Sequence, residues 1–319
     1  MPEADVLVLF EHPEWQKPLF AALEKNGVRY ATFDLKAAAF VAGDAPPAKI
    51  VFNQASPSAY VRGNARAVPL ALAFLRALEA SGRPVLNGHR AFALELSKTA
   101  QAALLGRLGI RTPRSIAFND LDALRDQLAR ETKWKWPALL KPEQGGSGAR
   151  IIKVDSYDEL RAHVESTRGI WEPDGVLLVQ EYFEHDPERG IVRMELLGGE
   201  LLYAMRVVSH GRYNLCPSEV CNPSAGEGHC EIPVVAPAPA VEFYAFKEVP
   251  AEAVAQAKAI VQAGGIDVGG IEYLESNGAR VFYDVNANSN LRAPIAQEHG
   301  FDPFDRVAAW LAASAKRHG

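Results

Sequence analysis

Short apolar runs and longer amphipathic segments alternate over about the first 95 residues of the chain. Run 6–10 is continuously apolar and predicts a buried strand, and run 49–54 predicts another strand. Segments 14–27 and 68–82 repeat apolar residues every three to four positions, as helices do. This β-α-β alternation predicts a small, doubly wound, mostly parallel sheet. No Gly-x-Gly-x-x-Gly turn follows the first run, so dinucleotide binding has little support.

The pattern then changes to helices separated by hairpins. A helix is expected from residue 91 to a Gly-x-x-x-Pro stop, and hairpins are expected at 136–154, 191–208 and 269–286. A doubly wound unit followed by antiparallel hairpins predicts a chain of mixed α/β and α+β class. We expect three units, at residues 1–92, 93–181 and 182–319.

Charge and cysteine content narrow the class of protein. A formal net charge of −5 argues against nucleic-acid and anionic-membrane binding, and no apolar run has the length of a membrane span. The first residues lack the basic start of a signal peptide. Three cysteines, an odd number, suit a reducing compartment. We therefore expect a cytoplasmic, multi-domain protein, with a homodimer as the default assembly.

A lysine and a glycine-rich loop lie close together in segment 136–154. Lys141 lies within an apolar strand, where an unpaired ammonium group is costly, so an anionic partner is implied. The Gly-Gly-Ser-Gly loop at 145–148 lets backbone N–H groups approach phosphate oxygens. A plain hairpin turn and an edge lysine that reaches solvent are the alternatives. Together the two features predict a phosphate-covering loop.

Two carboxylates and an amide are candidates for a metal site in the last hairpin. Asp284 and Asn286 are two positions apart in a strand, so both point to one face, and Glu272 lies on the preceding strand. Carboxylate and amide oxygens are hard ligands that suit Mg²⁺ bound together with nucleotide phosphates. A solvated strand face is the alternative.

The turn decides whether Glu272 joins the other two. A two-residue Asn277-Gly278 loop would pair Glu272 with Tyr283, whereas a three-residue loop starting at Ser276 pairs it with Phe282. The three-residue loop collects the apolar side chains on the opposite face, so we favour it. That apolar face would hold Ile271, Tyr273, Val281, Tyr283 and Val285.

A further apolar strand runs into Gln180-Glu181-Tyr182 and is a candidate hinge whose backbone pairs with an adenine edge. Arg193 and Arg206 lie on the two arms of the next hairpin, where they can stabilise a transferring phosphoryl group. For each arginine alone, a surface salt bridge is the simpler interpretation.

Taken in order, these motifs resemble those of the ATP-grasp superfamily, most closely its RimK-type and glutathione-synthetase-like ligases. The resemblance covers essentially the whole chain and implies an ATP-grasp fold behind a doubly wound pre-ATP-grasp domain. Segment 96–115 resembles the family's lysine-bearing helix and its Gly-Ile-x-x-Pro entry. The sequence departs from the pattern at Val192, where the family has an acidic residue. It also has Glu272 and then Asp284 where many members have Asp and then Glu.

The resemblance implies an ADP-forming carboxylate–amine ligase that uses ATP and Mg²⁺, with Mn²⁺ as an alternative metal, and acts through an acyl phosphate. Small-molecule carboxylates and amines are the implied partners. The implied residues are Arg193, Arg206 and Lys141 for catalysis; Lys98, Lys141, Gly145, Gly146, Ser147, Gly148, Gln180, Glu181, Tyr182, Phe183 and Glu188 for ATP; Glu272, Asp284 and Asn286 for the metal; and Arg212, Asn214, Arg292, Asn288 and Asn53 for the substrate.

Alternatives remain at this stage. Cys216, Cys221, His229 and Cys230 are compatible with a zinc clip, although reduced loop cysteines fit their spacing better. Arg292 can bind a substrate carboxylate in bidentate fashion or form a salt bridge with Glu298. An ATP-binding protein without turnover, and a carboxylate kinase that stops at the acyl phosphate, are the competing functions.

Overall fold

The computed structural model describes residues 4–44, 46–146, 148–210, 241–289 and 291–318. Its first sheet is parallel, with strand order β2-β1-β3-β4, as the alternating pattern predicted. The strands are β1 (Ala4–Phe10), β2 (Tyr30–Asp34), β3 (Ala48–Gln54) and β4 (Val85–Leu86).

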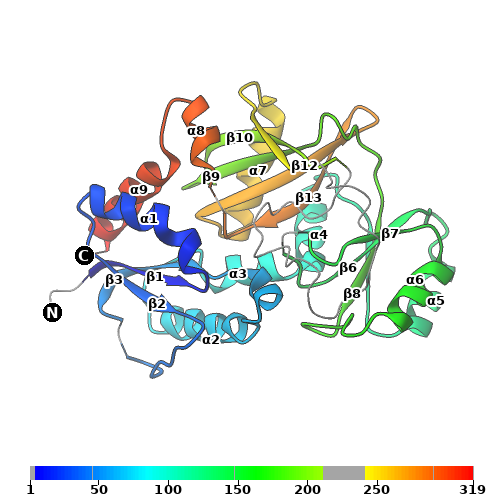
Figure 1. Cartoon of the computed structure of the whole chain (residues 1–319), viewed down its shortest axis with the longest axis horizontal. Helices are drawn as coiled ribbons and strands as arrows, with labels where there is room; N and C mark the ends of the chain where they lie inside the picture. The colour runs from blue at the N-terminus through cyan, green and yellow to red at the C-terminus, as the bar shows by residue number, and fades with distance from the viewer. Residues whose placement is uncertain (1–3, 45, 147, 211–240, 290, 319) are drawn as a thin grey trace.

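Helices from both ends of the chain cover this sheet (Figure 1). α1 (Pro13–Lys25) and α2 (Ala67–Ala80) follow β1 and β3, with the 3-10 helix η1 (Pro57–Arg62) before α2. The C-terminal helix α9 (Pro303–Arg317) packs against α1 and β1, and its apolar side chains share a core with those of β1. The end of the chain therefore completes the first unit, although the sequence placed it in the third.

A second, antiparallel sheet has the order β5-β8-β6-β7. Helices α5 (Leu121–Arg130) and α6 (Tyr157–Ser166) contact it, and Leu124, Leu160 and Val179 lie in their common core. The predicted hairpin around the glycine-rich loop is present as β6 and β7. The strands are β5 (Ser115–Phe118), β6 (Ala138–Pro142), β7 (Ile152–Val154) and β8 (Leu177–Glu181).

The third sheet is also antiparallel, with the order β11-β10-β9-β12-β13. α7 (Ala251–Gly264) packs on it together with α3 (His89–Leu96) and α4 (Lys98–Arg107) (Figure 1). α8 (Ala293–Glu298) contacts β11. The strands are β9 (Ile191–Leu197), β10 (Glu200–Val208), β11 (Glu242–Ala245), β12 (Val268–Ser276) and β13 (Ala279–Asn286).

The single helix predicted from residue 91 is two helices that meet at Ser97. The Ser97 backbone is extended, with φ −125° and ψ 108°, and its Oγ accepts a hydrogen bond from the Ala100 N–H at 3.0 Å. This is an N-cap, which satisfies a helix-terminal N–H and stabilises a new helix start. Lys98 is consequently the first residue of α4.

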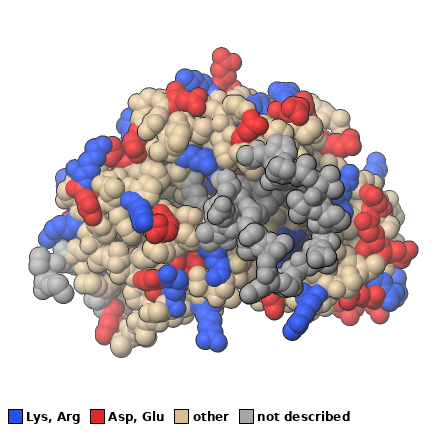
Figure 2. All heavy atoms as spheres, viewed as in Figure 1, with Lys and Arg blue, Asp and Glu red and all other residues tan. Residues whose placement is uncertain are grey.

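The surface agrees with the modest net charge. Figure 2 shows Lys and Arg as well as Asp and Glu side chains across the visible face. None of the helices in the described part of the chain is long and apolar enough to cross a membrane.

Candidate functional site

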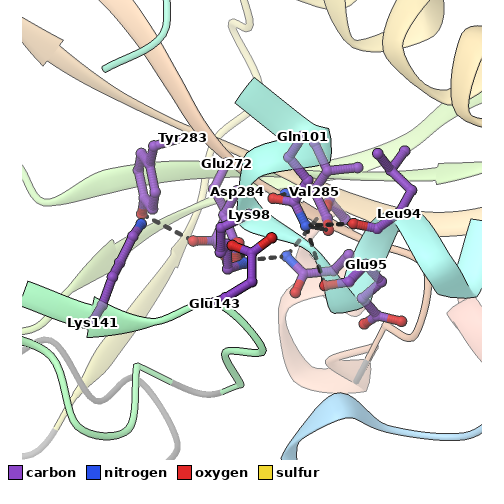
Figure 3. A network of polar contacts seen from close by, with 12 residues as sticks. Leu94, Glu95, Lys98, Gln101, Lys141, Glu143, Glu272, Tyr283, Asp284 and Val285 are labelled. Atoms are coloured by element: carbon purple, nitrogen blue, oxygen red, sulfur yellow. Dashed lines mark hydrogen bonds and ion pairs between the residues drawn. The ribbon is translucent and has the colours of Figure 1, made fainter. Parts of the chain in front are cut away.

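A cavity lies between the second and third sheets, next to α1 and η1 of the first unit. The described residues that line it include side chains of β6 and β8 of the second sheet, of β9 to β13 of the third, and of α1, α3, α4 and the start of η1. Figure 3 shows charged side chains from these elements converging on it. The site is thus built from all three units of the chain.

Lys98 enters the cavity from the start of α4. The carboxylate of Glu143, just after β6, accepts hydrogen bonds from Ser97 Oγ at 2.5 Å and from the Thr99 N–H at 3.1 Å. A carboxylate at a helix N-terminus is stabilised by the helix dipole and by the free N–H groups there. Glu143 therefore joins the start of α4 to the end of β6, which carries Lys141.

Lys141 is buried on β6, and its Nζ donates a hydrogen bond to Gln180 Oε1 at 2.7 Å. Gln180 lies on the neighbouring strand β8 and in turn donates to Ser115 Oγ at 2.8 Å. Burial lowers the pKa of Lys141 to about 7, and the positive charge of Lys98 adds to the effect. No ion pair of Lys141 occurs among the described residues, so an anionic ligand would stabilise its charged form.

Four side chains form a row across the third sheet, because the register aligns Met205 of β10, Arg193 of β9, Glu272 of β12 and Asp284 of β13. Arg193 Nη1 donates to Glu272 Oε1 at 2.7 Å, and Lys98 Nζ forms an ion pair with Asp284. Asn286, two residues beyond Asp284, donates to Asp284 Oδ2 at 3.0 Å. The structure thus brings the predicted acidic pair and amide together.

The register that achieves this differs from the predicted one. Ser276 pairs with Ala279, so the turn is the two-residue Asn277-Gly278 loop, with φ of 49° and 73° at its two residues. A β-bulge between Glu272 and Tyr273 then shifts the pairing by one residue and sets Glu272 opposite Asp284.

The same bulge exchanges the faces of the sheet on which Phe282 and Tyr283 were expected to lie. Phe282 joins Tyr273 in the core below the sheet, whereas Tyr283 lines the cavity and donates its hydroxyl hydrogen bond to Glu272 Oε2 at 2.9 Å. The prediction that Tyr283 lies on the apolar face and that Glu272 pairs with Phe282 is therefore wrong.

The two carboxyl groups have opposite pKa shifts. Burial and the neighbouring Asp284 charge raise the pKa of Glu272, despite its contacts with Arg193 and Tyr283. Burial would also raise the pKa of Asp284, but the adjacent Lys98 ammonium group outweighs it and lowers that pKa. Asp284 is consequently the group more strongly held as a carboxylate, and its present counter-charge is a flexible lysine.

Arg193 is fixed by three partners. Besides Glu272, its Nε donates to Glu195 Oε1 at 2.6 Å and its Nη2 to Ser289 Oγ at 3.2 Å. Burial opposes its charge, but Glu195 and Glu272 more than offset this and raise its pKa. A Cβ on Gly270 would lie 2.5 Å from Arg193 Nη2, so the glycine leaves the space that the guanidinium occupies. Arg193 is a preorganised cation at the cavity wall.

Arg206 lies on the other face of the sheet from Arg193 and does not line the cavity. The prediction that both arginines lie at the site is therefore wrong for Arg206. A bulge between Leu201 and Tyr203 shifts β10 by one residue, so that Met205 and not Ala204 is opposite Arg193. Arg206 therefore points to the other face, where it lies 4.4 Å from the Phe246 ring centroid and 3.6 Å from Glu275 Oε2.

The glycine-rich loop closes against the first unit. Gly146 has φ 154°, and a Cβ there would lie 2.6 to 2.9 Å from the Cβ, Cα and backbone N of Ser58 in η1. Gln144 Nε2 also donates to the Pro57 carbonyl at 3.2 Å. Gly145, Gly146 and Gly148 line the cavity, whereas Ser147 is outside the described residues. The loop forms one wall of the cavity.

The predicted hinge residues also lie at the cavity. Gln180, Glu181, Tyr182 and Phe183 all line the cavity. Glu181 accepts a hydrogen bond from the Arg114 N–H at 2.9 Å. Glu188 is exposed and is absent from the cavity lining, so the structure does not bring it to the site.

The predicted substrate residues divide into three groups. Arg292 lines the cavity 3.3 Å from the Phe243 ring centroid, and no salt bridge to Glu298 is present. Asn288 also lines it, while its Nδ2 donates to the Gln54 and Ala55 carbonyls at 2.9 and 3.1 Å. Asn53 is buried and donates to the Asn87 carbonyl at 3.2 Å, so it stabilises the first unit and does not line the cavity.

Arg212 and Asn214 lie outside the described residues, as do Cys216, Cys221, His229 and Cys230, the four residues of the less favoured zinc clip. Among the residues that are described, no group of three or more His, Cys, Asp and Glu side chains forms a metal site.

Sequence reasoning missed three buried residues around α4. Gln101 donates through Nε2 to the Val285 carbonyl at 2.9 Å and accepts from the Val285 N–H at 3.1 Å, which joins α4 to β13. Glu143 was missed as the cap described above. Glu95 lines the cavity, accepts from the Asn288 N–H at 3.1 Å, and has its pKa raised to about 8 by burial. A polar residue on the apolar face of a helix was the available signal for Glu95 and Gln101.

No protein-family model matches the chain. Two relatives align with it. The first is the alpha-aminoadipate–LysW ligase LysX of Saccharolobus solfataricus, at 29% identity over 39% of this chain and 43% of the relative. The second is a probable alpha-L-glutamate ligase of an Enterobacter species, at 25% identity over 75% of this chain and 71% of the relative. The aligned segment thus spans less than half the length of the first relative.

Solved structures match the fold over nearly the whole chain. A RimK-domain ATP-grasp protein of Sphaerobacter thermophilus matches with a TM-score of 0.66 at 17% identity, covering 96% of this chain and 99% of that one. The ATP-grasp ligase PsnB, in complex with a minimal precursor, Mg and ADP, gives 0.63 at 19% identity and covers 99% of both chains. The D-alanine–D-alanine ligase of Bacillus anthracis, in complex with ATP, gives 0.67 at 14% identity and covers 98% of this chain and 97% of that one.

The chain has the ATP-grasp fold, with an N-terminal parallel sheet and two antiparallel sheets. Both sequence relatives are named as ligases, and the solved structures that share this fold include ATP-grasp ligases.

Proposed function

We propose that the protein is an ADP-forming carboxylate–amine ligase that acts through an acyl phosphate. The observation that carries this proposal is the convergence of Lys98, Lys141 and Arg193 with Glu272 and Asp284 on a single cavity. Charged groups of both signs are buried there at high cost, which is characteristic of a site that binds a charged ligand.

We assign the phosphates of ATP to the space between the two lysines and the glycine-rich loop. Lys141 has no ion-pair partner among the described residues, and Lys98 is held only by Asp284, so both can form charge-assisted hydrogen bonds to phosphate oxygens. The loop covers the cavity and would keep water from a reactive acyl phosphate. The hinge at 180–183 is the proposed adenine side.

The donor set at the acidic end fits Mg²⁺. Glu272, Asp284 and Asn286 offer hard oxygen ligands, and the Lys98 ammonium group on Asp284 marks a position where a cation is stabilised. When bound there with phosphate, the metal would neutralise charge on the β- and γ-phosphates. Three protein ligands without a closed cage are typical of magnesium held jointly with a nucleotide.

The chemistry requires no covalent protein intermediate. A carboxylate oxygen of the substrate attacks the γ-phosphorus, and the bond to the β,γ-bridging oxygen breaks to release ADP. An amine then attacks the acyl carbon, the bond to the phosphate oxygen breaks, and the amine loses a proton as phosphate leaves. Arg193, fixed by Glu195 and Glu272, is placed to stabilise charge on the transferring group.

The relatives support this reaction class. Their names describe ligases that act with alpha-aminoadipate or alpha-L-glutamate, both of them amino acids, and the superfamily neighbours include a D-alanine–D-alanine ligase. We therefore propose an amino acid as at least one of the two substrates.

Release of ADP and phosphate by the purified protein tests the proposal. The protein is supplied with ATP, Mg²⁺ and a pool of amino acids and amines, and products are identified by mass spectrometry. We expect ADP release that depends on the pool, an amide product, and loss of at least 100-fold in rate for Lys141→Ala, because a charge opposite the phosphates contributes several kcal/mol.

Other outcomes separate the competing functions. Tight nucleotide binding without ADP release from any pool would support a binding protein. A hydroxamate formed on trapping with hydroxylamine, without an amide product, would support a carboxylate kinase. A Lys141→Ala variant as active as the unaltered protein would contradict the assignment of the phosphates.

A further inference from the structure

A second cavity adjoins the first one. It has a volume of about 650 Å³ and lies between α1, α8 and α9, with β3 and β12 contributing to its wall. Trp15, Phe243 and Arg292 line both cavities, so these three residues stand at the boundary between them. Nothing in the proposed binding of ATP uses this space.

The walls of the second cavity are mostly apolar. Side chains from the first unit, from α9 and from the segment around α8 contribute to it, and its volume is within the range of small-molecule sites. Ser289, one of its few polar residues, is engaged with Arg193 and Glu195. The apolar lining consists of Trp15, Pro18, Leu19, Phe52, Phe243, Val268, Leu291, Ala293, Pro294, Ile295, Phe304 and Val307.

Arg292 supplies the charge at the boundary. Among the described residues it has no ion-pair partner, and its guanidinium lies over the Phe243 ring at 3.3 Å from the centroid. Burial and the nearby Arg193 charge lower its pKa to about 10, so it remains charged near neutral pH. A partly buried guanidinium without a carboxylate is a site for an anion, and a carboxylate matches its two parallel N–H donors.

We propose that this second cavity binds the side chain of the amine substrate, which is an amino acid with a bulky apolar side chain whose own carboxylate lies on Arg292. The inference rests on the proposed ligase function and names the class of its acceptor. A free carboxylate distinguishes an acceptor amino acid from the carboxylate donor, whose acid group must reach the γ-phosphate. The amino group then faces the first cavity, where the acyl phosphate would form.

The residues around the second cavity also exclude other side chains. A charged side chain surrounded by the apolar residues of the lining would lose its hydration, which costs several kcal/mol unless it reaches Glu14, Gln16 or Gln54 at the wall. A small side chain would leave most of the 650 Å³ unfilled and forgo the gain of apolar burial. Large aliphatic and aromatic amino acids are therefore the expected acceptors.

Calorimetric binding to the protein saturated with Mg²⁺ and a non-hydrolysable ATP analogue tests this inference without requiring the donor. The probes are racemic phenylalanine, racemic aspartate, glycine and phenethylamine, which lacks the carboxylate. We expect phenylalanine to bind at least 10-fold more tightly than each of the other three, since burial of an aromatic side chain and a carboxylate–arginine pair each exceed a tenfold effect.

Two variants and one control assign the contacts. Ala293→Phe, which fills the cavity, should weaken phenylalanine binding at least 10-fold and leave glycine unaffected. Arg292→Met should remove the preference for phenylalanine over phenethylamine. Ala313→Phe, at an exposed position of α9 outside both cavities, is the matched control and should bind phenylalanine normally.

The inference would be overturned if aspartate or glycine bound as tightly as phenylalanine, if no amino acid bound, or if Ala293→Phe weakened all probes equally. Failure of the ligase proposal is distinguishable. In that case nucleotide either does not bind, or binds without any ADP release from amino-acid pools. ADP release that depends on polar amino acids alone would overturn only the assignment of the second cavity.

Discussion

At the scale of single residues, the site depends on buried charges that are incompletely neutralised. Among the described residues, Lys141 donates its hydrogen bond to the neutral Gln180 and forms no ion pair, and Arg292 lies over an aromatic ring. Such buried charged groups lower the stability of the folded, ligand-free protein, because burial disfavours their charged form. An anionic ligand stabilises that charged form, so the same groups strengthen ligand binding.

Lys141 should take up a proton when nucleotide binds. Burial lowers its pKa in the free protein to about 7, well below the usual value for a lysine, so the neutral form predominates above pH 7. Phosphate oxygens favour the ammonium form. The folded free protein then binds fewer protons than the unfolded chain between about pH 7 and 10. This group's contribution to stability consequently rises with pH in that window.

Calorimetry at pH 8.5 in two buffers with different ionisation enthalpies measures this proton uptake. We expect uptake of up to one proton per nucleotide in the unaltered protein and a large decrease in Lys141→Arg, which stays charged throughout. Equal uptake by the two proteins would show that the proton is taken up elsewhere.

Asp284→Asn should raise the Mg²⁺ concentration needed for half-maximal ATPase or ligase activity by at least 10-fold, since an amide binds the cation more weakly than a carboxylate. The substitution also removes the partner of Lys98. Asp305→Asn, which breaks an ion pair with Lys25 at the surface, is the control. An unchanged metal titration would remove Asp284 from the site.

At the scale of the elements, the positions of the charged side chains follow from strand register. The hairpins and the alternation of β13 were predictable, because apolar and polar residues alternate in it and Asn277-Gly278 marks the turn. The two bulges were not predictable from the sequence, because an extra residue in one strand depends on packing against neighbours that are distant in the chain. One bulge brings Glu272 to Asp284, and the other turns Arg206 away.

The sequence also did not predict that a new helix, α4, begins after Ser97. Apolar periodicity continues through Ser97, so residues 91–107 have the pattern of one helix. The break requires the Ser97 cap and the Glu143 carboxylate, which is 46 residues away in sequence. Long-range contacts of this kind decide element boundaries that local propensity leaves open.

Gln101 should be a structural link between α4 and β13 on which the position of Lys98 depends. Gln101→Ala leaves the N–H and carbonyl of Val285 without their partner, and we expect a loss of about 2–4 kcal/mol in the free energy of unfolding. Gln127→Ala on α5, whose side chain donates to Glu131, should cost less than about 1 kcal/mol. Urea denaturation measures both, and equal losses would contradict this role.

At the scale of the whole molecule, the cavity exists only because the three units meet. The glycine-rich loop of the second unit contacts Ser58 of the first, and Asn288 of the third bonds to the end of β3. The fold class and the order of the motifs were predictable from the sequence. The packing of α9 on the first unit was not predictable, because the sequence of an amphipathic helix does not indicate which sheet the helix covers.

Closure of the loop should be sensitive to one methyl group. In Gly146→Ala, the new Cβ would meet the Ser58 backbone and the residue would keep a φ of 154°, so the loop cannot adopt this closed position. We expect ligase turnover to fall at least 10-fold, with a midpoint of unfolding within a few degrees of the unaltered protein. Gly106→Ala, in α4 with open space around it, is the control and should retain activity. Normal turnover in Gly146→Ala would show that closure against Ser58 is unnecessary.

The most direct test of the account is a crystal structure with Mg²⁺ and a non-hydrolysable ATP analogue. We predict phosphate oxygens within hydrogen-bonding distance of Lys98 Nζ and Lys141 Nζ, and a metal ion coordinated by Glu272, Asp284 and Asn286. A nucleotide bound elsewhere, or one whose phosphates lie away from both lysines with the acidic pair still occupied by Lys98 and Arg193, would contradict it.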